Sequence, residues 1–156
     1  MNVIGLIRTR FTKHEGTPIQ PSTAKGASGT VEVYEQYREA LRDLDGFERI
    51  WLVYLFDRAA EFSPLVKPYR DTTERGLFST RAPSRPNPLG ISAVRLVSVE
   101  PEKGELSVEG IDVLDRTPLL DIKPYIPEFD AFPNSRAGWM DASASKQSLA
   151  DKRFTR

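Results

Sequence analysis

The sequence of 156 residues contains no cysteine and only one histidine, His14. The absence of cysteine excludes disulfides, catalysis by a thiolate and zinc sites built on cysteine, and a lone histidine removes most other transition-metal sites. A Ser-His-Asp hydrolase would have to use His14, yet no nucleophile-elbow sequence is present. We therefore expect a protein without disulfides and without a bound metal.

The common nucleotide and membrane signals are also missing. There is no G-x-G-x-x-G and no G-x-x-x-x-G-K-[ST], so the sequence predicts neither a Rossmann dinucleotide site nor a P-loop. No apolar run reaches the length of a membrane span, and the N-terminus lacks the basic segment and long hydrophobic core of a secretion signal. With 39% hydrophobic residues, the chain suits one compact cytoplasmic domain without membrane contact.

Charge is balanced over the whole chain but uneven along it. Lysine and arginine total 22, as do aspartate and glutamate. Residues 67–95 hold six basic and two acidic side chains, a net charge of +4, whereas residues 96–130 hold nine acidic and three basic ones, a net charge of −6. A basic segment in a neutral protein fits contact of one face with a polyanion. From charge alone, a solvated surface fits equally well.

Short runs of β-branched and aromatic residues separated by turns predict a mainly β protein. The predicted strands are residues 3–11, 30–34, 47–56, 76–80, 91–100, 105–113 and 118–127. Residues 35–44 place Tyr37, Leu41 and Leu44 at helical spacing, which predicts the one sizeable helix. Since strands do not alternate with helices, the pattern favours a small antiparallel β-barrel over a doubly wound sheet.

Two segments rich in proline and glycine separate predicted strands. Residues 14–29 form a long connector, a kind of loop that is usually functional or disordered in compact domains. Residues 81–90, called here the proline arm, contain Arg81, Arg85, Asn87 and three prolines. Proline restricts its own φ and the preceding residue, so the arm is stiff, and its polar side chains suit phosphate, carboxylate or base edges. Three prolines alone would fit a turn at a sheet rim, but the arginines and Asn87 favour a binding site.

Three aspartates, Asp112, Asp115 and Asp121, surround the turn sequence of residues 116–118. A pair of carboxylates can perform acid-base catalysis, whereas aspartate is also a common turn former. Asp115 is the favoured candidate because it directly precedes the turn. A site with no strong nucleophile and no metal suits methyl transfer, where alignment supplies much of the rate, although the residues alone do not single out that reaction.

Two long motifs in register carry a resemblance to a known family. Residues 78–90 resemble the pattern F-x-T-R … R-P-N-P-[IL]-G, and residues 112–125 resemble D-x-x-D-x-T-P-[LV]-[LV]-D-I-K-P-Y. Both belong to the TsaA-like, or TrmO, group of tRNA methyltransferases, and the resemblance extends over residues 3–133. It implies a β-barrel domain over residues 1–135. The polar composition of residues 136–156 predicts a tail after this domain.

This resemblance implies an enzyme that uses S-adenosylmethionine to methylate N6 of threonylcarbamoyl-adenosine beside the anticodon of tRNA. It also implies a homodimer. As alternatives, the residues leave open a non-catalytic RNA- or nucleotide-binding barrel and a methyltransferase acting on a small molecule. The basic segment of residues 67–95 makes a small-molecule substrate less attractive.

Motif positions transfer the family's site residues onto this chain. Arg81, Arg85 and Asn87 are the expected tRNA contacts, and Asn87 or Asp115 is expected to assist the attacking amine. Longer members place His-Gln at Asp57-Arg58 and glycine at Arg116. The implied cofactor-binding positions are Gln20, Pro21, Ser22, Thr23, Asp57, Arg58, Arg81, Ser92, Asp115, Arg116, Thr117, Pro118 and Leu119.

Overall fold

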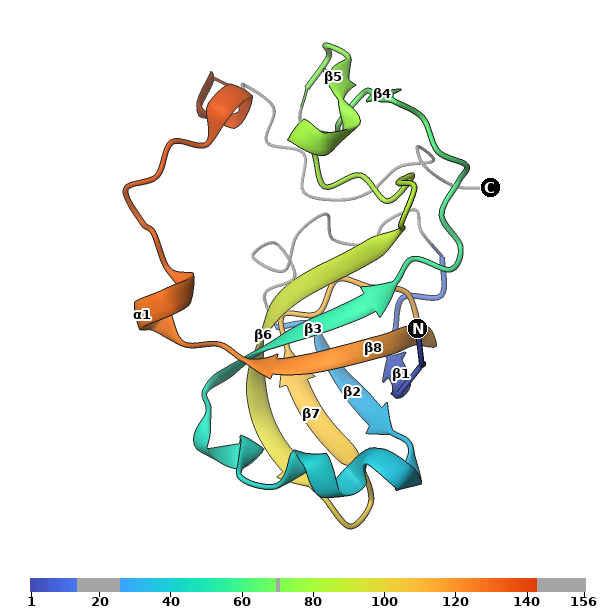
Figure 1. Cartoon of the computed structure of the whole chain (residues 1–156), viewed down its shortest axis with the longest axis vertical. Helices are drawn as coiled ribbons and strands as arrows, with labels where there is room; N and C mark the ends of the chain where they lie inside the picture. The colour runs from blue at the N-terminus through green and yellow to red at the C-terminus, as the bar shows by residue number, and fades with distance from the viewer. Residues whose placement is uncertain (14–25, 70, 143–156) are drawn as a thin grey trace.

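A closed six-stranded antiparallel barrel forms the body of the protein in the computed structural model, which describes residues 1–13, 26–69 and 71–142 (Figure 1). The strand order around the barrel is β1-β2-β7-β6-β3-β8, and β1 pairs with β8 to close it. The predicted mainly β, non-Rossmann barrel is confirmed. The strands are β1 (Gly5–Arg8), β2 (Ser28–Val33), β3 (Arg49–Leu55), β6 (Leu89–Glu100), β7 (Glu105–Glu109) and β8 (Thr117–Pro124).

Smaller elements decorate the barrel. β4 (Leu65–Val66) and β5 (Arg75–Gly76) form a separate two-stranded sheet, and α1 (Pro127–Asp130) follows β8. The 3-10 helices are η2 (Glu35–Leu41), η3 (Leu44–Gly46), η4 (Leu77–Ser79) and η5 (Gly138–Ala142). Within the described part of the chain, no helix is long and apolar enough to span a bilayer.

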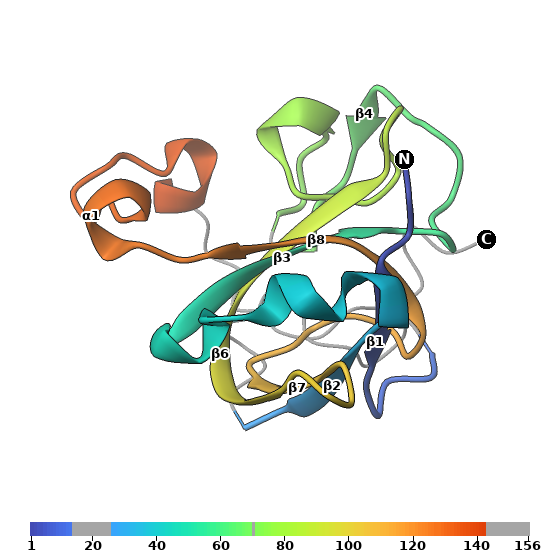
Figure 2. The ribbon, with the colours of Figure 1, turned by 60° about the horizontal axis from the view of Figure 1, so that its bottom comes forward.

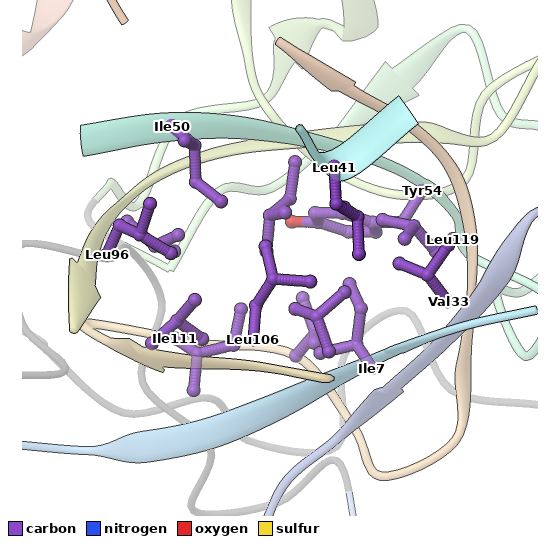
Figure 3. Close-up of a cluster of buried hydrophobic side chains, with 14 residues drawn as sticks. Ile7, Val33, Leu41, Ile50, Tyr54, Leu96, Leu106, Ile111 and Leu119 are labelled. Atoms are coloured by element: carbon purple, nitrogen blue, oxygen red, sulfur yellow. The ribbon is translucent and has the colours of Figure 1, made fainter. Parts of the chain in front are cut away.

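The core fills the barrel interior with alternate residues of each strand (Figure 3). In β3, Ile50, Leu52 and Tyr54 point inward and are at most 3% exposed, as the two-residue period of a strand requires. Leu41 of η2 is also buried in this cluster. Figures 1 and 2 show η2 lying across the end of the barrel opposite to β4 and β5. The 3-10 segment therefore closes one end of the core.

Two sequence-based predictions need correction in detail. The helix expected over residues 35–44 is the 3-10 helix η2, which begins without a side-chain cap and is only seven residues long, so little favours a longer α-helix. The strand expected over residues 76–80 is wrong. There the chain turns through η4, because Leu77 is buried in a satellite cluster with Val66 and Ala82. The predicted hairpin of residues 91–100 and 105–113 is confirmed as β6 and β7.

Antiparallel alternation brings three connections to the same end of the barrel. β1, β3 and β7 end there, and β2, β6 and β8 begin there, as their registers show. The connections are residues 9–27, residues 56–88 and residues 110–116. We call this the loop end. The connector, most of the proline arm and the aspartate-containing turn predicted to be functional all belong to these three connections.

Candidate functional site

Backbone hydrogen bonds link two of the three connections of the loop end and close the third at its base. The N–H of Asp115 donates to the carbonyl of Phe11 at 2.8 Å, so the turn is fixed to the chain that follows β1. The other links are from Gly110 N to Ala27 O at 2.9 Å and from Phe56 N to Pro88 O at 2.7 Å. The first two links hold the aspartate turn against the connection between β1 and β2, and the third fixes the base of the proline arm to the end of β3.

Arg58 joins the loop after β3 to the aspartate turn. Its Nη2 donates to the carbonyl of Asp115 at 3.0 Å and to Oγ1 of Thr117 at 3.2 Å. Its Nε donates to Oδ1 of the neighbouring Asp57 at 3.2 Å. Four of the positions implied by the resemblance therefore meet, although they are up to 60 residues apart in the sequence.

Asp115 uses its carboxylate to hold the ends of β1 and β8 together. Oδ1 accepts from Nε of Arg8 at 3.1 Å and from the backbone N–H of Thr9 at 3.1 Å. Burial acts to raise the pKa of Asp115, but these hydrogen bonds and the charge of Arg8 outweigh it and lower the pKa below its usual value. Asp115 is therefore an ionised side chain already paired within the protein.

Arg116, next along the turn, has a left-handed backbone with φ of +64°. A non-glycine residue rarely adopts this conformation, because its Cβ crowds the following carbonyl. Arg116 is also the position where longer members of the resembled family carry glycine. The left-handed conformation is therefore a requirement of the backbone at position 116, whether arginine or glycine stands there.

A chain of polar side chains crosses the loop end from inside the barrel. The hydroxyls of Tyr54 and Ser92 are 2.9 Å apart, and Ser92 donates to Oδ1 of Asp112 at 2.9 Å. Tyr54 and Ser92 are almost fully buried, at 3% and 1% exposure, whereas Asp112 is half-buried. Because the single Ser92 proton is directed to Asp112, the Tyr54 hydroxyl must donate to Ser92. We call these three residues the Tyr54 chain.

Arg81 of the proline arm acts electrostatically on the Tyr54 chain. Burial raises the pKa of Asp112 to about 6, while the Ser92 hydrogen bond and the positive charge of Arg81 act in the opposite direction. Burial likewise raises the pKa of Tyr54, which therefore remains a neutral hydroxyl, and Arg81 again opposes the shift. The charge of Arg81 thus acts on the aspartate segment through Asp112 within a single chain, and the common cofactor cleft expected of the two segments stays a prediction.

Arg85 is engaged inside the proline arm and its approach. Nη1 donates to the carbonyl of Thr80 at 3.0 Å, with longer contacts to the carbonyls of Leu77 and Ala82 at 3.4 Å. Its guanidinium also lies 5.4 Å from the ring centre of Phe78. Arg85 thereby stiffens the arm. Asn87 is exposed and directly precedes Pro88 at the base of the arm, and the tRNA contacts expected of Arg85 and Asn87 stay predictions.

A hollow of about 510 Å³ lies on the outer side of β1, β2 and β7. Its walls include Arg8, Arg10, Thr30 and Glu109, and it reaches Asp115 at one edge. The lining also includes Val108, a buried residue of the barrel core. The hollow therefore adjoins the loop end and reaches the edge of the core.

Other predicted positions lie elsewhere or outside the described residues. Gln20, Pro21, Ser22 and Thr23 of the connector fall outside the described ranges. Leu119 is buried in the barrel core and Pro118 is half-buried in β8.

Asp121, the third aspartate of the series, forms an ion pair with Lys123 at 2.9 Å and takes no part in the polar contacts given above. Among the residues that the structure describes, no three acidic or histidine side chains lie together as a metal site would require.

Tyr54 is not among the residues predicted from the sequence, and Asp115 is favoured there over Asp112. The signal for Tyr54 was the alternation of residues 50, 52 and 54, which places a hydroxyl-bearing ring on the inner face of β3. Asp112 was visible as the first aspartate of the D-x-x-D motif. Its partners Tyr54 and Ser92 lie 58 and 20 residues away, so only the barrel topology reveals the contact.

Known proteins match this chain over nearly its whole length. The profile of the tRNA-methyltransferase O N-terminal domain matches residues 6–131. A "probable S-adenosyl-L-methionine-binding protein" of Pyrococcus abyssi is 48% identical over 154 residues, covering 97% of this chain and 82% of that protein. The tRNA (adenine(37)-N6)-methyltransferase of Escherichia coli K12 is 32% identical over 152 residues, covering 92% of this chain and 65% of that enzyme.

A solved structure is similar to both the fold and the sequence. The crystal structure of TrmO from Pseudomonas aeruginosa superposes with a TM-score of 0.77 at 41% identity, covering 91% of this chain and 62% of that one. The chain therefore spans about four fifths of the Pyrococcus protein but somewhat less than two thirds of the other two.

Proposed function

Because the chain belongs to the tRNA-methyltransferase O N-terminal domain family, we propose that it is a tRNA methyltransferase that transfers a methyl group to N6 of an adenosine. The methyl donor is S-adenosylmethionine, and the substrate class is tRNA modified next to the anticodon, with threonylcarbamoyl-adenosine as the preferred acceptor. Relatives named as S-adenosylmethionine-binding and as tRNA (adenine(37)-N6)-methyltransferases support this assignment.

The observation that carries the proposal is the meeting of complementary polar groups at the loop end. Arg58 and Arg81 bring positive charge to the loop end, beside the hydroxyls of Ser92 and Thr117. S-adenosylmethionine carries a carboxylate that suits the arginines and a ribose diol that suits the hydroxyls. When bound, the donor supplies a methyl group already activated by its sulfonium, so the protein needs neither metal nor nucleophile.

We assign Arg58, Arg81, Ser92 and the turn of residues 115–117 to holding the methyl donor. The proline arm, held stiff by its prolines and by Arg85, presents Asn87 and the basic segment toward the RNA. A pre-ordered arm loses less conformational entropy on binding than a flexible one would. Binding of tRNA through these cations should weaken as salt rises.

The first test compares Arg81→Ala with a matched control, Arg42→Ala. Arg42 is an exposed arginine paired with Glu39 just after η2, and neither residue is part of the core. We expect Arg81→Ala to lose labelled methyl transfer to total tRNA while its melting temperature stays close to that of the wild type, because an exposed arginine contributes little to the core. The control should keep full activity. Normal turnover by a folded Arg81→Ala protein would remove Arg81 from the site.

Calorimetry with S-adenosylmethionine separates the main alternative, a barrel that binds RNA without catalysis. A protein that binds the donor should release heat and melt at a higher temperature, because a ligand specific for the native state stabilises it. No heat and no shift, together with retained tRNA binding, would favour the RNA-binding alternative.

We also propose a homodimer in the cytoplasm as the working form. Light scattering on the purified protein tests the dimer, and a mass corresponding to one 17.6 kDa chain would contradict it.

A further inference from the structure

The Tyr54 chain has features that a purely structural hydrogen-bond network does not need. Its two inner members are fully buried, yet its last member, Asp112, is a half-buried carboxyl at the loop end. Burying a carboxylate is costly unless it is paired, and none of the ion pairs among the described residues includes Asp112. Asp115, three residues later, is by contrast paired with Arg8.

We propose that Asp112 is the catalytic base that removes the proton from the adenosine N6 during methyl transfer. This inference rests on the proposed function and changes its chemistry, because sequence analysis had assigned the assisting role to Asn87 or Asp115. Oδ1 of Asp112 accepts the Ser92 hydroxyl. The substrate proton is therefore assigned to the other carboxylate oxygen, Oδ2.

The step balances without any further reactant. As the N6–methyl bond forms, the methyl–sulfur bond breaks and its electron pair stays on sulfur. N6 gives up one proton, which passes to Oδ2 of Asp112, and the resulting carboxylic acid later releases it to water. An exocyclic amine needs this help, since its lone pair is delocalised into the adenine ring and, in the carbamoylated base, into the adjacent carbonyl.

Ser92 and Tyr54 act on this step as positioning residues. Ser92 fixes the orientation of the carboxyl group by donating to Oδ1 at 2.9 Å. Tyr54 donates to Ser92 and so strengthens the hydrogen bond that Ser92 gives to the carboxylate. Within the described residues, the charged group that acts on Asp112 is Arg81 of the proline arm, whose positive charge favours the ionised carboxylate of Asp112. The base is therefore held by β3 and β6 and tuned by the arm.

The test uses the full chain carrying Asp112→Asn, with Asp45→Asn as the matched control. Asparagine can still accept the Ser92 hydroxyl but cannot take up a proton. Asp45 is an exposed aspartate of η3, outside the proposed site. We expect Asp112→Asn to lower the single-turnover rate of methyl transfer about 100-fold or more, while calorimetric binding of S-adenosylmethionine and of tRNA stays unchanged. The control should match the wild type.

The pH profile provides a readout that a structural role would not move. The wild-type rate should rise with pH as Asp112 ionises and then level off, and this acid limb should disappear in Asp112→Asn. Tyr54→Phe should keep the limb but shift it to higher pH, because the carboxylate loses support from the hydrogen-bond chain.

Three results would overturn the assignment in distinguishable ways. A wild-type rate and pH profile in folded Asp112→Asn would mean that the proton leaves by another route. Loss of donor or tRNA binding in that variant, with an unchanged rate at saturation, would make Asp112 a binding residue. If the wild type itself transfers no methyl group to any tRNA, the proposed function fails and the inference fails with it.

Discussion

Replacing Asp112 by asparagine should make the unliganded protein more stable at neutral pH. In the folded protein, burial raises the pKa of Asp112 from 3.8 to about 6, so at pH 7.5 the fold holds a half-buried carboxylate that the unfolded chain would solvate better. Each unit of pKa difference between the folded and the unfolded state corresponds to about 1.4 kcal/mol, so the largest effect on the free energy of unfolding is roughly 3 kcal/mol.

The sign of the pH dependence follows from which state holds the proton. Between pH 3.8 and about 6, the folded wild type keeps a proton on Asp112 that the unfolded chain has released. Its free energy of unfolding therefore falls as pH rises through this window and is flat for this group above it. The destabilisation caused by ionising Asp112 is absent below pH 3.8 and complete above about pH 6. Asp112→Asn cannot ionise and therefore avoids it at every pH.

Urea unfolding of both proteins at several pH values between 4 and 7.5 measures the effect. The difference in the free energy of unfolding between the variant and the wild type should be near zero at pH 4. At pH 7.5 it should approach about 3 kcal/mol in favour of the variant. Asp45→Asn should show no such trend. A difference that is independent of pH, or a variant that is less stable only at neutral pH, would refute the claim that Asp112 is a destabilising buried carboxylate.

Two further substitutions probe the backbone around the site. Gly90→Ala would place its Cβ 2.1 Å from the Tyr54 ring, which cannot remain in place, so we expect a loss of about 1–3 kcal/mol in urea unfolding, with Gly46→Ala, where nothing lies within 4 Å, as the control. Arg116→Gly should raise the free energy of unfolding by about 0.5–1 kcal/mol, because glycine accepts the φ of +64° more readily, whereas Arg42→Gly at a φ of −55° should lower it. If a variant and its control changed the free energy of unfolding by the same amount, the explanation given for that position would be contradicted.

The barrel could be predicted from the sequence because strand formation depends on local patterns of residues. Alternation of apolar and polar residues predicted most strands, and the absence of helices between them excluded a doubly wound sheet. The wrong prediction of a strand at residues 76–80 also has a physical cause. Leu77 is buried against Val66 and Ala82, and this small cluster requires a turn where the composition alone favours a strand.

The candidate site was harder to predict because its contacts join distant segments. The motifs identified Asp115 and Arg81, but nothing in the local sequence showed that Asp115 is paired with Arg8 while Asp112 is not. Likewise, the arginines of the proline arm look alike in the sequence, yet Arg85 donates to backbone carbonyls and Arg81 acts on the Tyr54 chain. These distinctions depend on strand register, which a single sequence does not specify.

The turn between β6 and β7, residues 101–104, stands at the opposite end of the barrel from the loop end. Glu102 in this turn is exposed, and the native chain contains no thiol that would compete for a label. A Glu102→Cys protein would therefore accept a single fluorophore far from the predicted RNA-binding face. The same position would let the protein be tethered to a surface with its proposed catalytic end directed toward solution.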